Sequence, residues 1–110
     1  MDILTEGKLI EKTTKSGFKV INHITSGDTS RFGNITKSKW LQHHDTGIVF
    51  GGGKYKGGIT GVQIFKTGSN KYKLEFIRGY VMGSPIKIVK RVENVDAKML
   101  YSTLKKYLGI

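Results

Sequence analysis

The sequence predicts an α+β fold in which an antiparallel sheet of about five to six short strands carries one C-terminal helix packed on it. Two observations indicate this fold. Between residues 60 and 92, three short runs alternate apolar and polar side chains at period two, as half-buried strands do. From residue 94 to residue 108, apolar side chains recur instead at the spacing of a helix. We expect one domain over residues 1–110, with a β-β-β-α unit at 59–108 and a β extension at 1–50.

The first two runs of this unit are predicted to form a β-hairpin. Apolar and polar residues alternate over 62–64 and again over 72–76. The four residues between the strands, 67–70 (T-G-S-N), are small turn formers that suit a hairpin loop. Two glycines and the only proline then predict a loop at 79–85, which leads to a third strand at 86–92.

The third strand alternates imperfectly. We expect three residues on its inner face (Ile86, Ile88 and Val92) and three on its outer face (Lys87, Val89 and Arg91). Lys90 breaks the inner pattern, so a β-bulge or a snorkelling stem is expected there.

The final helix is expected to begin at a cap formed by Asn94 or Asp96 and to end before Gly109. Lys105 and Lys106 fall in its last turn, where the helix dipole alone accounts for them. One apolar stripe is expected to pack on the sheet: Ala97, Leu100, Tyr101, Leu104, Tyr107 and Leu108.

The N-terminal half is predicted to extend the sheet. Residues 8–12 and 18–24 are expected to be two strands joined by a short turn. Residues 25–34 show no periodicity and many turn formers, which predicts a surface loop. Residues 38–44 fit either a helical turn or the start of a strand, and residues 47–50 fit a short buried strand.

The positive charge lies mainly in the second half of the chain. The net charge is +11; residues 1–50 carry 7 basic against 5 acidic side chains, and residues 51–110 carry 12 against 3. Such a field attracts polyanions, so DNA or RNA is the expected partner and an anionic membrane is not. A protein that is merely basic and soluble is the alternative interpretation.

Composition also bears on the compartment. The absence of cysteine excludes disulfides and thiolate metal sites. The start of the chain lacks the basic residues and apolar stretch of a signal peptide, and apolar runs are only a few residues long. We therefore expect a soluble protein located in the cytoplasm.

Six glycines between residues 51 and 61 surround Lys54, Tyr55 and Lys56. Neither the Walker pattern nor the dinucleotide fingerprint fits this segment. Two interpretations stay open: a basic connector whose backbone amides approach a phosphate, or a plain linker.

Trp40 can either anchor the core or offer a ring on which a base stacks, and we favour the core because a large aromatic contributes heavily to a small one. The titratable candidates for chemistry are scattered along the chain, and adjacent histidines diverge on strands and helices alike. The sequence therefore predicts no catalytic residue, no metal, no cofactor and no enzymatic activity. These candidates are His23, Asp28, His43, His44, Asp45 and Glu75.

The hairpin, third strand and final helix, with the ending V-E-N-V-D-A-K-M-L-Y-S-T-L-K-K-Y, resemble the DNA-binding domain of plant ethylene-response factors. Relatives of that three-stranded-sheet-plus-helix domain occur in phage homing endonucleases and other mobile-element proteins. The resemblance implies that the outer sheet face enters the DNA major groove, supported by the helix. In this sequence, the positions that correspond to the outer face are Gln63, Phe65, Lys71, Lys73 and Glu75. Lysine lacks the planar fork that reads guanine, so phosphate contacts are expected.

We expect a small non-enzymatic nucleic-acid-binding protein that contacts phosphates through a lysine-rich sheet face. The expected contacts are Lys54, Lys56, Lys66, Lys71, Lys73, Lys87 and Arg91. The chain also resembles, in its size and style, phage inhibitors of host defence such as anti-CRISPR proteins. That alternative implies a host nucleic-acid enzyme as partner, held through Arg31 and Phe32, since arginine and aromatic residues dominate interfaces.

Overall fold

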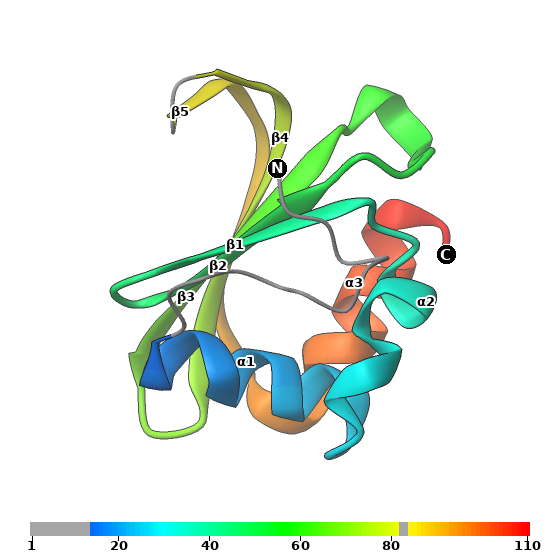
Figure 1. Cartoon of the computed structure of the whole chain (residues 1–110). Helices are drawn as coiled ribbons and strands as arrows, with labels where there is room; N and C mark the ends of the chain where they lie inside the picture. Colours follow the sequence, from blue (N-terminus) through cyan, green and yellow to red (C-terminus); the bar gives the residue numbers. More distant parts are fainter. Residues whose placement is uncertain (1–13, 82–83) are drawn as a thin grey trace.

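The computed structural model describes residues 14–81 and 84–110 (Figure 1). Its elements follow in chain order: α1 (Lys15–Thr25), η2 (Thr29–Arg31), α2 (Phe32–Thr36), β1 (Trp40–His44), β2 (Gly47–Gly51), η3 (Lys56–Gly58), β3 (Gly61–Gly68), β4 (Lys71–Val81), β5 (Ser84–Asp96), η4 (Ala97–Met99) and α3 (Leu100–Leu108). None of the helices in these described ranges is both long enough and apolar enough to cross a membrane.

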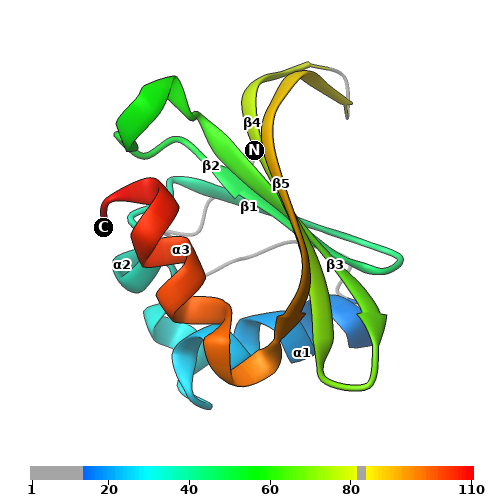
Figure 2. The same ribbon diagram turned by 180° about the vertical axis from the view of Figure 1, so that it is seen from behind.

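The five strands form one antiparallel sheet in the order β1-β2-β3-β4-β5, each paired with the next along the chain. Both α1 and α3 lie on the same side of this twisted sheet (Figures 1 and 2). We call that side the helix side and the opposite side the outer face. The α+β class, with an antiparallel sheet and a C-terminal helix, is confirmed.

The core lies between the sheet and the two longer helices. The alternation predicted for the central hairpin is confirmed, because Val62, Ile64, Leu74 and Phe76 are all fully buried on the helix side. From α1 the core receives Val20, Ile21 and Ile24, and from α3 it receives Leu100, Leu104 and Leu108.

Residues 18–24 form part of helix α1, so the prediction of a strand there is wrong. Val20, Ile21 and Ile24 fall on one helical face and are buried, whereas Phe18 is exposed. Thr14 caps the helix by accepting a hydrogen bond from Gly17 N–H through its side chain. The strand predicted at 8–12 lies outside the described residues.

The prediction of a surface loop at 25–34 is also wrong in part. It contains the end of α1, the short helix η2 and the first half of α2. Phe32, which was expected in the middle of an exposed loop, is only 1% exposed and packs edge-on against Phe50. Residues 38–44 resolve into strand β1, and the buried strand predicted at 47–50 is confirmed as β2.

The strands of the central hairpin are longer than predicted. Only Ser69 and Asn70 separate β3 from β4, and Asn70 adopts a positive φ of 57°. The loop predicted at 79–85 is wrong, because β4 continues to Val81 and β5 already begins at Ser84. Proline is tolerated at residue 85 because β5 is an edge strand, where one missing backbone donor costs little.

Strand β5 contains the bulge expected near Lys90. Phe76 pairs with Lys90 but Ile77 pairs with Ile88, which leaves Val89 without a partner on β4. One extra residue reverses which side every preceding side chain faces. The predicted inner face is therefore wrong: Ile86 and Ile88 are 68% and 37% exposed.

A second irregularity in β5 explains why the expected helix cap is absent. Asn94 adopts a φ of 56° where the pairing with β4 shifts again, so it belongs to a bulge. Asp96 precedes η4 without a side-chain capping hydrogen bond. The stop at Gly109 is confirmed by its φ of 75° and its N–H bond to the Lys105 carbonyl. Tyr101 is 36% exposed, so its place in the buried stripe is wrong.

Candidate functional site

The structure divides the seven basic residues predicted to bind nucleic acid among three places. They lie on the outer face (Lys71, Lys73 and Arg91), on the helix side of the sheet by strand alternation (Lys66 and Lys87), and in the β2–β3 connector (Lys54 and Lys56). A single lysine-rich sheet face made by all seven is therefore not present.

On the outer face, Glu75 neutralises its basic neighbours. Its Oε2 accepts a hydrogen bond from Arg91 Nε at 3.0 Å and lies 3.9 Å from Lys73 Nζ. Its Oε1 accepts from Gln63 Nε2 at 2.9 Å. The residue is only 6% exposed, so the carboxylate is held within this network rather than in water. Lys73 also lies over the Phe65 ring, 4.9 Å from its centroid.

Lys71, the third basic residue of the outer face, is also paired. Its Nζ lies 2.8 Å from Asp96 Oδ1, and this hydrogen bond and charge lower the pKa of the Asp96 carboxyl. Asp96 therefore stays ionised near neutral pH and cancels the lysine charge. All three predicted cations of the outer face thus face a carboxylate.

On the helix side, two lysines from different elements meet at one tyrosine ring. Lys90 Nζ of β5 and Lys106 Nζ of α3 lie 5.8 and 5.3 Å from the centroid of Tyr107. The Tyr107 ring itself packs against Phe76 at a centroid distance of 5.0 Å. Because this ring is fixed by the core, it holds two ammonium groups near each other at the surface.

Arg78 extends this positive region towards η3. Its Nε and Nη2 donate to the carbonyls of Gly58 and Gly57, each at 3.2 Å. Neither acceptor is charged, so the guanidinium keeps its full positive charge. Lys87 is directly opposite Arg78 in the pairing of β4 with β5.

Two further lysines complete the region. The stem of Lys56 lies against Gly109 at the end of α3, and Lys105 Nζ is 5.5 Å from the Tyr101 ring. Both β5 and η3 contact α3, and Figure 2 shows η3 close to the end of α3. Within residues 14–81 and 84–110, none of these cations forms an ion pair with a carboxylate. We call this group the basic surface: Lys56, Arg78, Lys87, Lys90, Lys105 and Lys106.

Sequence reasoning missed four of these six residues, namely Arg78, Lys90, Lys105 and Lys106. Lys105 and Lys106 had a sufficient local explanation in the helix dipole. The signal that could have found Lys90 is its position in an otherwise apolar pattern, because regular alternation from Val92 places it on the helix side, towards α3.

The two adjacent histidines have structural roles at the N-terminus of α1. His43 Nδ1 accepts the Thr14 N–H at 3.1 Å, and Thr14 Oγ1 donates to the His44 carbonyl at 2.9 Å. Burial lowers the pKa of both rings, and the neighbouring imidazole of His44 lowers the pKa of His43 further. Among the described residues, no three histidine, aspartate or glutamate side chains gather as metal ligands.

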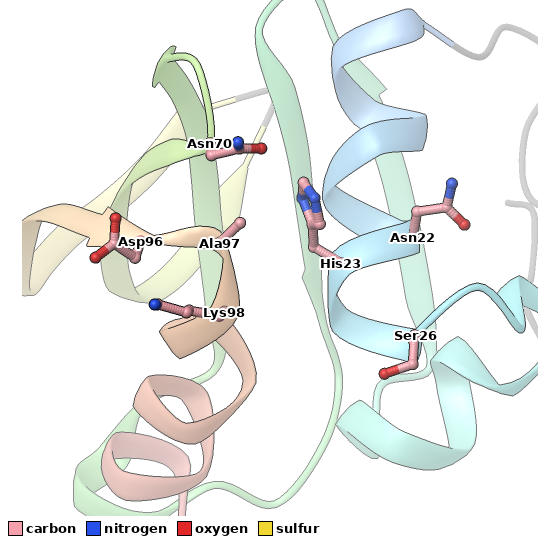
Figure 3. A pocket seen from close by; sticks show the side chains of 7 residues that line it. All are labelled: Asn22, His23, Ser26, Asn70, Asp96, Ala97 and Lys98. Carbon is pink, nitrogen blue, oxygen red and sulfur yellow. The ribbon is translucent and has the colours of Figure 1, made fainter.

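His23, predicted within a strand, lies on α1 and lines a polar pocket of about 540 Å³ (Figure 3). Its Nδ1 is 2.7 Å from the Tyr72 hydroxyl, and burial raises the pKa of that tyrosine. Figure 3 shows His23 pointing towards Asn70 across the pocket, while the charged ends of Asp96 and Lys98 point away from it. The pocket therefore does not bring these charged groups onto the imidazole.

Trp40 lies on the outer face, half-buried, and stacks on Tyr80 with ring centroids 5.4 Å apart and an interplanar angle of 27°. The preference for Trp40 as a core anchor is therefore wrong. A Cβ at Gly51 or Gly52 would collide with its indole, so these glycines let the ring lie close to the backbone. The glycine-rich connector is more than a plain linker for this reason.

Comparisons of the chain with protein-family models, with curated proteins and with solved structures gave no match.

Proposed function

We propose that the chain is a small, basic, non-enzymatic nucleic-acid-binding protein that contacts phosphates through its basic surface. The observation that supports this function is the presence of six cations, without a carboxylate partner in the described residues, on the adjoining elements η3, β4, β5 and α3. Cations that are already paired must lose that partner before they bind a phosphate, whereas these do not. The outer face is consequently the weaker candidate.

Five of the six residues are lysines. An ammonium group is a point charge and does not read base edges as the arginine fork does. Binding should therefore depend strongly on salt and weakly on sequence, with DNA and RNA both accepted.

The direct test is fluorescence anisotropy with a random duplex DNA, a hairpin RNA and a single strand at several salt concentrations. If six phosphates are neutralised on duplex DNA, the affinity should fall with salt at a log-log slope of roughly −5. No binding to any of the three ligands at low salt would contradict the proposed function.

A pair of double variants tests which surface binds. Lys90→Gln with Lys106→Gln should lower the slope by about 2 units and the affinity roughly 30-fold near 0.15 M salt. Lys71→Gln with Lys73→Gln removes the same charge from the outer face and should change the affinity much less, because those lysines are paired. Equal losses would show a diffuse charge effect and would contradict the assignment of the basic surface.

The alternative of a protein partner held through Arg31 and Phe32 loses one of its anchors. Phe32 is buried in the core and offers no ring to a partner, which leaves only the exposed Arg31. Nucleic-acid binding is therefore the better-supported function.

A further inference from the structure

Beside the Trp40–Tyr80 stack lies a pocket of about 320 Å³ that the proposed phosphate contacts do not use. It is lined by Trp40, Gly52, Gly53, Thr60, Gly79 and Tyr80. Two aromatic rings and three glycines thus make a surface with almost no polar side chain. Pockets that bind small planar ligands are mostly apolar and begin at about 300 Å³, so the size suits one base.

The glycines make this pocket possible. At Gly52 the φ is +91°, and a Cβ there would meet both the Lys39 stem and the Trp40 ring. At Gly53 a Cβ would collide with the ring of Tyr55, whose hydroxyl is anchored to the Thr36 carbonyl at 2.8 Å. The backbone at Gly52 and Gly53 therefore carries no side chain and is fixed in position.

Charge around the pocket favours an anionic ligand. The Lys39 stem runs along Gly52, and exposed Lys54 follows Gly53 directly in the chain. Arg78 of the basic surface immediately precedes Gly79, whose N–H donates to Thr60 Oγ1 at 2.7 Å. None of the lining residues is acidic. The pocket therefore adjoins the basic surface along β4, where Arg78, Gly79 and Tyr80 follow one another.

We propose that this pocket takes one unpaired nucleobase, which stacks against Trp40 and Tyr80, so that the preferred ligand is a single-stranded nucleic acid. A base inside a duplex is covered on both sides by its neighbours and cannot enter, whereas a base in a single strand can turn outward. Aromatic stacking tolerates every base, which agrees with the weak sequence preference expected from lysine contacts. This inference rests on the proposed function and specifies its ligand.

Trp40 is the only tryptophan in the chain, so its fluorescence reports on this pocket alone. Titration with a single-stranded oligonucleotide, as RNA and as DNA, should quench the emission. An abasic oligonucleotide of equal length and a blunt duplex should bind the basic surface without quenching. Equal quenching by the abasic strand, or none by the single strand, would overturn the pocket assignment.

Variants provide the second measurement. Tyr80→Leu should weaken single-strand binding about tenfold, the usual contribution of one stacked base, and leave the affinity for the abasic strand unchanged. Phe18→Leu removes an exposed aromatic ring on α1 and serves as the matched control, with no expected change. Salt-dependent binding of all ligands without quenching would contradict the pocket while leaving the proposed function intact. Absence of all binding at low salt would contradict both.

Discussion

The outer face and the basic surface both contain cations of the same sheet, but only the cations of the outer face lie beside carboxylates. On the outer face, Glu75 and Asp96 lie within ion-pair distance of Lys71, Lys73 and Arg91. On the basic surface, the described residues contain no such pair, and two lysines share one tyrosine ring instead. The position of a few carboxylates, rather than the number of lysines, therefore decides where a free positive field remains.

Strand β5 supplies cations to both surfaces, and its bulge decides on which side of the sheet Lys87 lies. Arg91 faces outward beside Glu75, whereas Lys90 lies opposite Phe76 on the helix side. If β5 alternated regularly through Val89, Lys87 would lie on the outer face together with Arg91. With the bulge, Lys87 joins Arg78 on the helix side and Ile86 and Ile88 turn outward.

The largest expected effect comes from removing the acid of the outer face. Glu75→Gln keeps the shape but frees Arg91 and Lys73, and the loss of a charge-assisted network should lower the free energy of unfolding by roughly 1–2 kcal/mol. The freed cations should create a second, weak polyanion site. Calorimetric titration at low salt should then show two sites where the parent protein shows one.

Glu93→Gln is the matched control for that variant. Glu93 lies exposed on β5, the strand of Arg91, and forms no ion pair with any described residue, so the net charge changes equally without freeing a cation. If Glu93→Gln also produced a second site, overall charge rather than local pairing would separate the two surfaces.

The next effect comes from Lys87→Gln. Lys87 lies on the helix side, so the basic surface loses one phosphate contact, which predicts about fivefold weaker binding near 0.15 M salt and a slope smaller by about 1. Arg91→Gln removes the same charge from the same strand, but Arg91 is paired with Glu75 on the outer face, so this variant should bind nearly like the parent protein. Equal losses from the two variants would contradict the assignment of Lys87 and Arg91 to different faces.

The central hairpin could be predicted from the sequence because the signal for it, the alternation of apolar and polar residues, is local. Val62, Ile64, Leu74 and Phe76 alternate cleanly, and all four are buried as the period requires. The stop at Gly109 could likewise be predicted, since a glycine after the last apolar residue of a helix adopts the left-handed conformation cheaply.

Helix α1 was missed because a short apolar run suits either a strand or a helix. The segment 18–24 carries Val20, Ile21 and Ile24, which period two and period 3.6 both accommodate in part. The decisive contacts come from distant residues: His43 and His44 bind Thr14 and fix the start of the helix. Tertiary contacts of this kind leave no trace in the local pattern.

The distribution of the predicted cations over different faces could not be predicted for a similar reason. Arg91 approaches Glu75 because of the cross-strand register, and Lys87 lies opposite Arg78 because of the bulge at Val89. Lys90 and Lys106 meet at Tyr107 because α3 packs beside β5. None of these arrangements follows from charge counts along the chain. The total charge of the second half was visible in the sequence, but its free and neutralised parts were not.

The smallest expected effect concerns acid pH, which should separate the stability of α1 from binding at the basic surface. Burial lowers the pKa of His43 and His44, so the folded state favours the neutral rings. Their contribution to stability is fully present above the ordinary value of 6.5 and is lost as the pH falls through the lowered folded pKa. Protonation of His43 Nδ1 would also remove the acceptor of the Thr14 N–H.

Urea denaturation between pH 8 and pH 5 should show a falling free energy of unfolding, and the fall should be smaller in His43→Asn, which keeps an acceptor but does not titrate. The expected difference is under about 1 kcal/mol, since the rings are only partly buried. The basic surface contains no histidine, so folded protein should bind oligonucleotide equally well at pH 8 and at pH 5. A stability that is independent of pH in the parent protein would contradict the role assigned to His43.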